Sequence, residues 1–261
     1  MYRFVAKMLT TSGRLDAVQE TDKMIRHDEF SVIAIQAMLI TPDHSQFSQV
    51  NFLAKTLGKF ASRYTNVQAL ALPPEVPADV PRITLESYDK AFEVHASPSR
   101  IVSQWTAPSS GHEQTLPLTD CADVLLHYLD SSTVPIRVGR LALIVNWKLV
   151  TNDPAQKLIS QFCNKQVAEH QFLHSHDFEV HNHMAYELPG FSSMINSWVR
   201  CKAVTFTMPE QHRGVLVEQD INTQEGMLTN QFSTAQILPF FAAAYEESQS
   251  ILVSYFPSEE R

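Results

Sequence analysis

The strand-like and helix-like segments of this chain follow one another in an order that occurs twice, and this repetition constrains the fold more than any single motif. Residues 31–40 are rich in apolar and β-branched residues and end at Thr41-Pro42, which predicts a strand closed by a turn. A helix, a group of short strands and a second helix are predicted before Asp130. From about Ile136 a similar order begins again. We therefore expect two similar β-α-β-β-β-α halves.

In the first half, the spacing of apolar residues separates helices from strands. Residues 47–60 carry apolar side chains at three- and four-residue spacings, which predicts a helix. Residues 72–81 include four prolines, so this segment is expected to be a stiff, extended loop. A meander of three short strands follows at residues 82–87, 92–95 and 100–105. Thr119 or Asp120 can cap the next helix.

In the second half, residues 135–147 form the best predicted strand of the chain. Asp153-Pro154 marks a helix start, with aspartate as the N-cap and proline at the first helical position. A long polar insert then occupies residues 165–195, before a hairpin predicted at 198–208 and 214–221. Ser233 begins a capping-box pattern that opens the last helix. Because Pro239 lies just past the first turn, it predicts a kink or a later start.

These elements predict an α+β fold in which two halves join into one extended antiparallel sheet with helices packed on one face. The expected divisions are an N-terminal arm (residues 1–28), a first half (29–132) and a second half (133–261) containing the insert. The order of elements resembles the duplicated helix-grip architecture of the TATA-binding-protein class. Residue identity between the halves is negligible, so a coincidental α+β order is the alternative.

Four parts of the sequence are also similar to an uncharacterised, sporadically distributed bacterial family of similar length. They are residues 81–87 with 97–105, residues 137–146, Asp153 with its helix, and residues 215–220. The resemblance spans residues 30–256. The chain departs from it in the last helix, where Ala244 and Tyr245 stand in place of a histidine. The family's patchy distribution implies a mobile-element or phage-defence (antiviral) context, and it assigns no activity to any residue.

Composition and charge narrow the class of protein. With 261 residues, 44% of them hydrophobic, the chain can bury a sizeable core. A net charge of −8 argues against a dominant sequence-independent grip on nucleic acid, which needs clustered lysine and arginine. The three cysteines form no CxxC pair, so neither a zinc knuckle nor a dithiol redox motif is supported. The sequence has no apolar run of signal-peptide or bilayer-spanning length, so we expect a cytoplasmic protein that is not in a membrane.

The insert holds the densest polar cluster of the sequence, with five of the eleven histidines between residues 170 and 183. Imidazole is a common ligand for divalent transition metals such as zinc. The candidate ligands are His174, His176, Asp177, His181 and His183. On a strand, the members of each closely spaced histidine pair would point the same way. The alternative, which the length and polarity of the segment favour, is a solvated histidine-rich connection.

Two further groups are candidate ligand-binding residues. Arg137 and Arg140 lie at the head of a predicted strand, and guanidinium pairs suit phosphate or carboxylate groups because they donate in forks. Their structural alternative is ion pairing, with Gly139 marking a bulge or close packing. Trp105 and Trp147 end matching strands, where exposed rings could stack on nucleobases. Burial in the core is the more usual role of tryptophan.

No GxSxG, Walker A or HExxH pattern occurs in the sequence. We therefore expect a non-enzymatic binding or regulatory module without a cofactor, whose sheet face or groove engages a protein partner or a second copy of the chain. Two alternatives stay open. One is a metal-dependent hydrolase that uses the histidine-rich segment. The other is a single-stranded nucleic-acid binder whose groove is lined by the arginines and tryptophans, a reading that the net charge disfavours.

Overall fold

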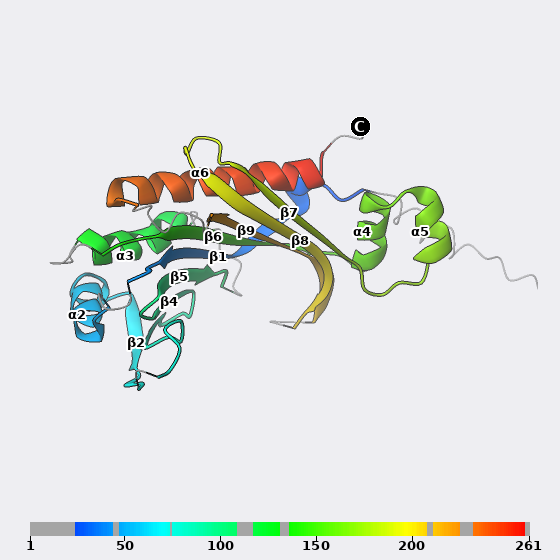
Figure 1. The fold of residues 1–261 in the computed structure, drawn as a ribbon. Coiled ribbons are helices and arrows are strands. Elements are labelled where there is room, and N and C mark those ends of the chain that lie inside the picture. The colour runs from blue at the N-terminus through cyan, green and yellow to red at the C-terminus, as the bar shows by residue number, and fades with distance from the viewer. Residues whose placement is uncertain are drawn as a thin grey trace, which may run out of the picture.

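The computed structural model describes residues 24–43, 47–73, 75–108, 117–130, 136–207, 211–224 and 232–258. Within these segments the strands form one antiparallel sheet in the order β2-β3-β4-β5-β1-β6-β9-β8-β7 (Figure 1). The strands are β1 (Ser31–Ile40), β2 (Tyr64–Ala69), β3 (Ile83–Ser87), β4 (Phe92–Ala96), β5 (Arg100–Thr106), β6 (Arg140–Val150), β7 (Glu179–Glu187), β8 (Met194–Phe206) and β9 (His212–Thr223). The protein is therefore an α+β protein with an extended antiparallel sheet, as predicted.

The first strands of the two predicted halves pair with each other at the centre of the sheet. Ile35 of β1 lies opposite Val145 of β6, and the two strands run antiparallel with one irregularity between Val32 and Ala34. On its other side β1 pairs with β5, and β6 pairs with β9, so each half extends the sheet outward from the centre. The sheets of the two predicted halves thus join side by side at β1 and β6. A duplication as the origin of the two halves stays a prediction.

The main helices of the described segments lie on one face of this sheet. The helical elements are the short 3₁₀ turn η1 (His27–Glu29), α2 (Gln49–Phe60), α3 (Leu118–Asp130), α4 (Pro154–Phe162), α5 (Lys165–Gln171) and α6 (Thr234–Tyr255). Helix α5 packs against α4 beyond the end of the sheet (Figure 1). Figure 1 shows α3 and α6 side by side over the sheet, where α3 contacts β1 and β5 and α6 contacts β6 and β9. None of these helices combines the length and the apolar composition that crossing a bilayer requires.

Local signals explain where the helices begin. The Ser48 hydroxyl accepts a bond of 3.4 Å from the Asn51 amide at the start of α2. At the start of α6, Ser233 and Gln236 form the predicted capping box, in which the Gln236 side chain accepts from the Ser233 amide over 3.0 Å. Of the two predicted effects of Pro239, the later start was wrong, because α6 begins at Thr234 and takes Pro239 into its interior, and the kink stays a prediction.

Alternation along the strands gives the sheet two different surfaces. In β1, Ile35, Ala37 and Leu39 are fully buried beneath the helices, whereas Gln36 and Met38 are partly exposed on the other side. We call the covered side the helix face and the uncovered side the open face. Most of the core lies on the helix face, where Phe52, Phe240 and other large side chains are fully buried. The open face is therefore the side of the sheet that the helices of the described segments leave uncovered.

Besides the short turn η1, three elements were not predicted from the sequence. Strand β2 extends the sheet at one edge, and helix α5 and strand β7 lie within residues 165–195. The histidine-rich insert is therefore not an irregular connection, since part of it forms the other edge strand. The end of the predicted N-terminal arm also packs on the fold. Ile25 is buried, and the His27 amide donates to the Phe256 carbonyl at the end of α6 over 2.7 Å. Residues 1–23 of that arm lie outside the described residues.

Candidate binding surface on the open face

Cross-strand pairing arranges the open-face side chains in rows that run across the sheet. The register places Gln36 of β1 directly opposite Gln104 of β5 on one side and Ile144 of β6 on the other. The row continues through Asp220 of β9 to Trp198 of β8. Side chains directly opposite on antiparallel strands lie within contact distance, so each row is a continuous strip. The strips combine amide, carboxylate and aromatic groups.

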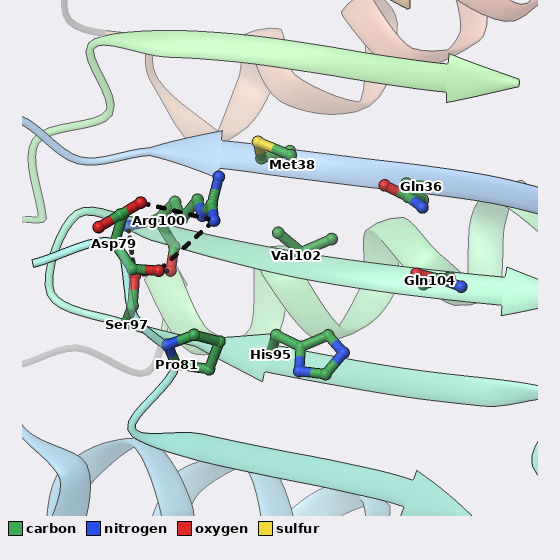
Figure 2. Close-up of a pocket in the computed structure, with 9 residues that line it drawn as sticks. All are labelled: Gln36, Met38, Asp79, Pro81, His95, Ser97, Arg100, Val102 and Gln104. Carbon is green, nitrogen blue, oxygen red and sulfur yellow. Dashed lines mark hydrogen bonds and ion pairs between the residues drawn. The ribbon is translucent and has the colours of Figure 1, made fainter. Parts of the chain in front are cut away.

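A hollow of about 240 Å³ lies on the open face over β1, β4 and β5. Figure 2 shows Gln36, Met38, Val102, Gln104 and His95 projecting from three neighbouring strands into this region. Asp79, Pro81, Ser97 and Arg100 complete its lining at the end nearest the proline-rich loop. The hollow is thus built from a sheet floor and a loop wall, and it is large enough for a side chain of a partner.

The Arg82 side chain holds the proline-rich loop in place through hydrogen bonds to carbonyl groups of the loop. Arg82 is buried, and its guanidinium donates to the carbonyls of Pro73 over 3.4 Å and Val76 over 3.1 Å. At the rim, the Arg100 guanidinium lies 4.0 Å from the Asp79 carboxylate. Both side chains are exposed, so this ion pair is weak and Arg100 can exchange it for a partner's carboxylate.

The polar groups inside the hollow are partly engaged by their neighbours. The His95 imidazole contacts the Glu93 carboxylate at 3.0 Å through Nε2 and the Thr84 hydroxyl at 3.3 Å through Nδ1. The Ser97 hydroxyl donates to the Arg100 carbonyl over 3.1 Å and accepts from the Arg100 amide over 3.2 Å, so it serves the β4–β5 turn. The facing amides of Gln36 and Gln104 offer both donors and acceptors, a combination that suits the polar groups of a peptide.

At the other end of the open face, β7, β8 and β9 carry a network of alternating charges. Arg200 lies 3.1 Å from the Glu179 carboxylate and 3.8 Å from that of Glu218. Lys202 also contacts Glu218, and His181 lies 2.7 Å from Glu179. Arg200 and Lys202 thus each face a carboxylate. The network has no strong net charge and is not a ready-made phosphate site.

The exposed tryptophan of the protein is Trp198, which the sequence reasoning did not select. Its side chain is 49% exposed, and its ring stacks on His183 of β7 with the ring centres 3.9 Å apart. Trp105 and Trp147 are each only 6% exposed, because they lie on the helix face of β5 and β6. Their predicted role as exposed stacking rings is corrected by this burial, which supports the alternative of core tryptophans.

The two candidate arginines of the second half differ in their surroundings. Arg137 precedes β6 and is exposed. Arg140 begins β6, and its guanidinium donates to the Asn222 side-chain oxygen over 2.6 Å. Gly139 lies between them and is packed closely, since a Cβ atom there would come within 3.1 Å of Pro42. The two arginines therefore do not form one shared binding site, and Arg140 makes a hydrogen bond within the sheet.

The candidate metal ligands fall in two separate places. His174 and His176 line a small pocket beside the start of α4, together with Asp153 and Arg213. His181 and His183 lie on the open face of β7, in the contacts described above. Asp177 is exposed in the segment between them. Within the described residues, no three His, Cys, Asp or Glu side chains come together as metal ligands would.

Comparison with known proteins gives no further guide to the site. No protein-family model matches the chain, and no curated protein is significantly similar to it in sequence. The functional argument therefore rests on the geometry of the open face.

Proposed function

We propose that the protein is a non-enzymatic binding module whose open face engages a partner protein. The observation that supports this most is the asymmetry of the sheet. One face is covered by helices, while the other carries strips of amide, charged and aromatic side chains with a hollow at one end. A surface of mixed polarity with an exposed tryptophan is typical of protein interfaces, in which tryptophan and arginine supply much of the binding energy.

The charge arrangement favours a protein over a single-stranded nucleic acid. Arg200 and Lys202 stand next to Trp198 along β8, a combination that could hold a phosphate and a base. Glu179 and Glu218 lie against these cations, and Asp220 lies opposite Trp198. A nucleic-acid backbone would meet these carboxylates at close range. A partner protein can match the alternating charges instead.

The hollow gives the proposed interface a place for an anchoring side chain. Its floor offers Met38 and Val102 for apolar contact and the Gln36 and Gln104 amides for hydrogen bonds. The Arg100 guanidinium at the rim can bind a carboxylate of the partner in place of the Asp79 carboxylate. A side chain with an apolar stem and a polar or acidic end would contact the apolar floor, the glutamine amides and the Arg100 guanidinium. The phage-defence context implied by the family resemblance is compatible with such a module and adds no chemistry to it.

Site-specific photo-crosslinking tests the proposal. Trp198 is replaced by the photoreactive aromatic amino acid p-benzoylphenylalanine, and the protein is irradiated in an extract of its native cells. The matched control carries the same group at Tyr88, which is 89% exposed in the β3–β4 turn. Both replacements exchange one aromatic ring for another at an exposed position, so the two probes match in chemistry and differ in location and in exposure, which is greater at Tyr88.

We expect an adduct from position 198 that is destroyed by protease and resists nuclease, and no matching adduct from position 88. A nuclease-sensitive adduct from position 198 would replace the proposal by the nucleic-acid alternative. Adducts of equal yield from both positions, or none from position 198, would contradict an interface on the open face.

A further inference from the structure

The outer edge of β7 presents unpaired backbone groups. The Phe178 carbonyl accepts from Ala203 over 3.1 Å, and the Leu188 amide donates to Ser193 over 3.0 Å. Both belong to the unbroken β7–β8 register, so the even-numbered residues of β7 bond to β8. The odd-numbered residues therefore turn their N–H and C=O groups outward, at Glu179, His181, His183, Ala185 and Glu187. Among the described residues no strand pairs with this edge.

A groove runs along this edge between β7 and α6. Its volume is about 580 Å³, and its lining comes from one stripe of α6 and from the end of β7, at Met184, Ala185, Tyr186, Glu247, Ser250, Ile251, Ser254 and Tyr255. Two hydrogen bonds set its width. The Tyr186 hydroxyl donates to Glu247 over 2.6 Å, and the Asn182 amide donates to the Tyr255 hydroxyl over 2.7 Å.

The two hydrogen bonds are separated by similar distances along β7 and along α6, so the groove between these elements runs parallel to the strand. Asn182 and Tyr186 are four strand residues apart, which corresponds to about 13 Å. Glu247 and Tyr255 are eight helix residues apart, which corresponds to about 12 Å. The helix therefore runs alongside the strand in the opposite direction with matched length. A chain added to the edge would have about four residues beside the groove, and alternate side chains would point into it.

The lining defines what those side chains should be. Met184 is 39% exposed and, with Ile251 and Tyr255, offers an apolar surface. Glu247 is the charged group of the lining. The hydroxyls of Ser250 and Ser254 already donate to carbonyls of α6. The groove thus suits an apolar side chain and, two residues away on the same side of the added strand, a lysine or arginine facing Glu247.

A second copy of this chain fits the edge less well. Antiparallel pairing of two β7 strands about His183 would place Glu179 of each copy opposite Glu187 of the other. Like charges directly opposite are destabilising. The net charge of −8 also opposes association of two copies and favours a basic occupant.

We propose that the edge of β7 and the β7–α6 groove bind an extended basic segment of a partner protein by strand addition, with an apolar and a basic side chain, two residues apart, pointing into the groove. Main-chain bonds to the odd-numbered residues of β7 supply affinity, and the groove supplies selectivity. The inference rests on the proposal that this is a protein-binding module. It uses a surface separate from the open face, so the two can fail independently.

The experiment selects binders from a random library of displayed peptides of about nine residues on the whole chain, and then measures their affinity by fluorescence anisotropy. The key variant is Ala185→Pro, which removes an outward N–H while leaving the bonds to β8 intact. Its matched control is Ala69→Pro at the opposite edge. There, the Leu70 amide donates to Arg82, so the N–H of Ala69 also points outward. Circular dichroism and urea unfolding check that both variants fold.

We expect the selected peptides to carry an apolar residue and, two positions away, a lysine or arginine. Ala185→Pro should lower their affinity by about tenfold or more, and Ala69→Pro should leave it within about twofold. Glu247→Gln should lower the affinity for basic peptides more than the affinity for their neutral analogues. N-methylation of alternate peptide amides tests strand pairing without changing the protein, since methyl groups should abolish binding in one register only.

The proposal is overturned if the library yields no peptides with an apolar and a basic residue two positions apart, or if both N-methylated registers bind equally. Equal binding by Ala185→Pro and the wild-type chain would also overturn it. A dimer in sedimentation velocity that Ala185→Pro dissociates would show that the second copy is the occupant instead.

Discussion

The hydroxyl of Tyr186 on the edge strand donates a hydrogen bond of 2.6 Å to the carboxylate of Glu247 on α6. Burial and the neighbouring Glu247 carboxylate both raise the pKa of Tyr186, so this hydroxyl keeps its proton and stays a donor at any physiological pH. The bond joins the last strand of the sheet to the helix that spans its centre. It also fixes one end of the β7–α6 groove.

Removing this bond should loosen the edge of the sheet modestly. We expect Tyr186→Phe to lower the free energy of unfolding by about 1 kcal/mol, because the bond is charge-assisted and only partly buried. Urea unfolding measures the change. Tyr88→Phe, in an exposed turn, is the control and should have no measurable effect. Equal stability of Tyr186→Phe and wild type would mean that the bond does not form in solution.

A buried polar cluster ties α6 to the centre of the sheet. The Trp147 indole donates to the Gln219 side-chain oxygen over 3.0 Å, and the Ser248 hydroxyl donates to the same oxygen. Trp147→Phe removes one donor and leaves a cavity, so we expect a loss of about 2 kcal/mol in urea unfolding. Trp198→Phe on the open face should cost less than about 0.5 kcal/mol. A reversed order of the two effects would contradict the assignment of the faces.

Two glycines should respond to alanine in opposite ways. At Gly214 in β9 an added Cβ would come within 2.1 Å of the Leu149 carbonyl oxygen. Because backbone cannot move aside cheaply, we expect Gly214→Ala to cost about 3 kcal/mol or more. At Gly58 in α2 an added Cβ meets nothing within 4 Å. Gly58→Ala should raise stability by about 0.5–1 kcal/mol, since alanine favours a helix more than glycine does. Thermal unfolding of both variants checks the pair.

The buried cysteines predict how stability and reactivity depend on pH. Burial raises the pKa of Cys121 and of Cys201 to about 12. Unfolded thiols ionise near pH 8.5, so between about pH 9 and 12 ionisation favours the unfolded chain and stability should fall as the pH rises. At pH 8 only Cys163, which is partly exposed, should react quickly with a thiol reagent. Three fast-reacting thiols in the folded protein would contradict the burial.

The dispersed histidines predict no dedicated metal site. Untagged protein, dialysed gently and measured by elemental mass spectrometry, should carry well under one metal ion per chain. The His174→Ala/His176→Ala variant should match the wild type. About one metal per chain in the wild type, lost in the variant, would restore the metal-dependent alternative.

The elements with clear periodicity were predictable from the sequence, and the edges of the sheet were not. Residues 31–40 form a strand as predicted, because the side chains of Ile35, Ala37 and Leu39 are buried under the helices and this requires apolar residues at alternate positions. Strands β2 and β7 were missed because an edge strand needs few apolar side chains. The sequence YTNVQA of β2 leaves five of its six residues exposed. The histidines of β7 were likewise interpreted as part of a solvated loop.

The exposure of Trp198 could have been predicted from the alternation of side chains along β8. Val199 and Cys201 are apolar neighbours on one side of β8, so Trp198, Arg200 and Lys202 must share the other side. By the same rule Trp147 shares the side of Leu143 and Val145, which are fully buried. The partner strands of these residues depend on pairing between distant segments. Their neighbours across the open face could not be predicted before the sheet order was known.

The most direct test of the central claim is the affinity of the purified chain for the protein that position 198 crosslinks. Isothermal titration should show that Trp198→Ala lowers this affinity by about tenfold or more, since tryptophans at the centre of interfaces carry much of the binding energy. Tyr88→Ala should leave it within about twofold. If Trp198→Ala binds that protein as tightly as the wild type does, the open face is not the binding surface.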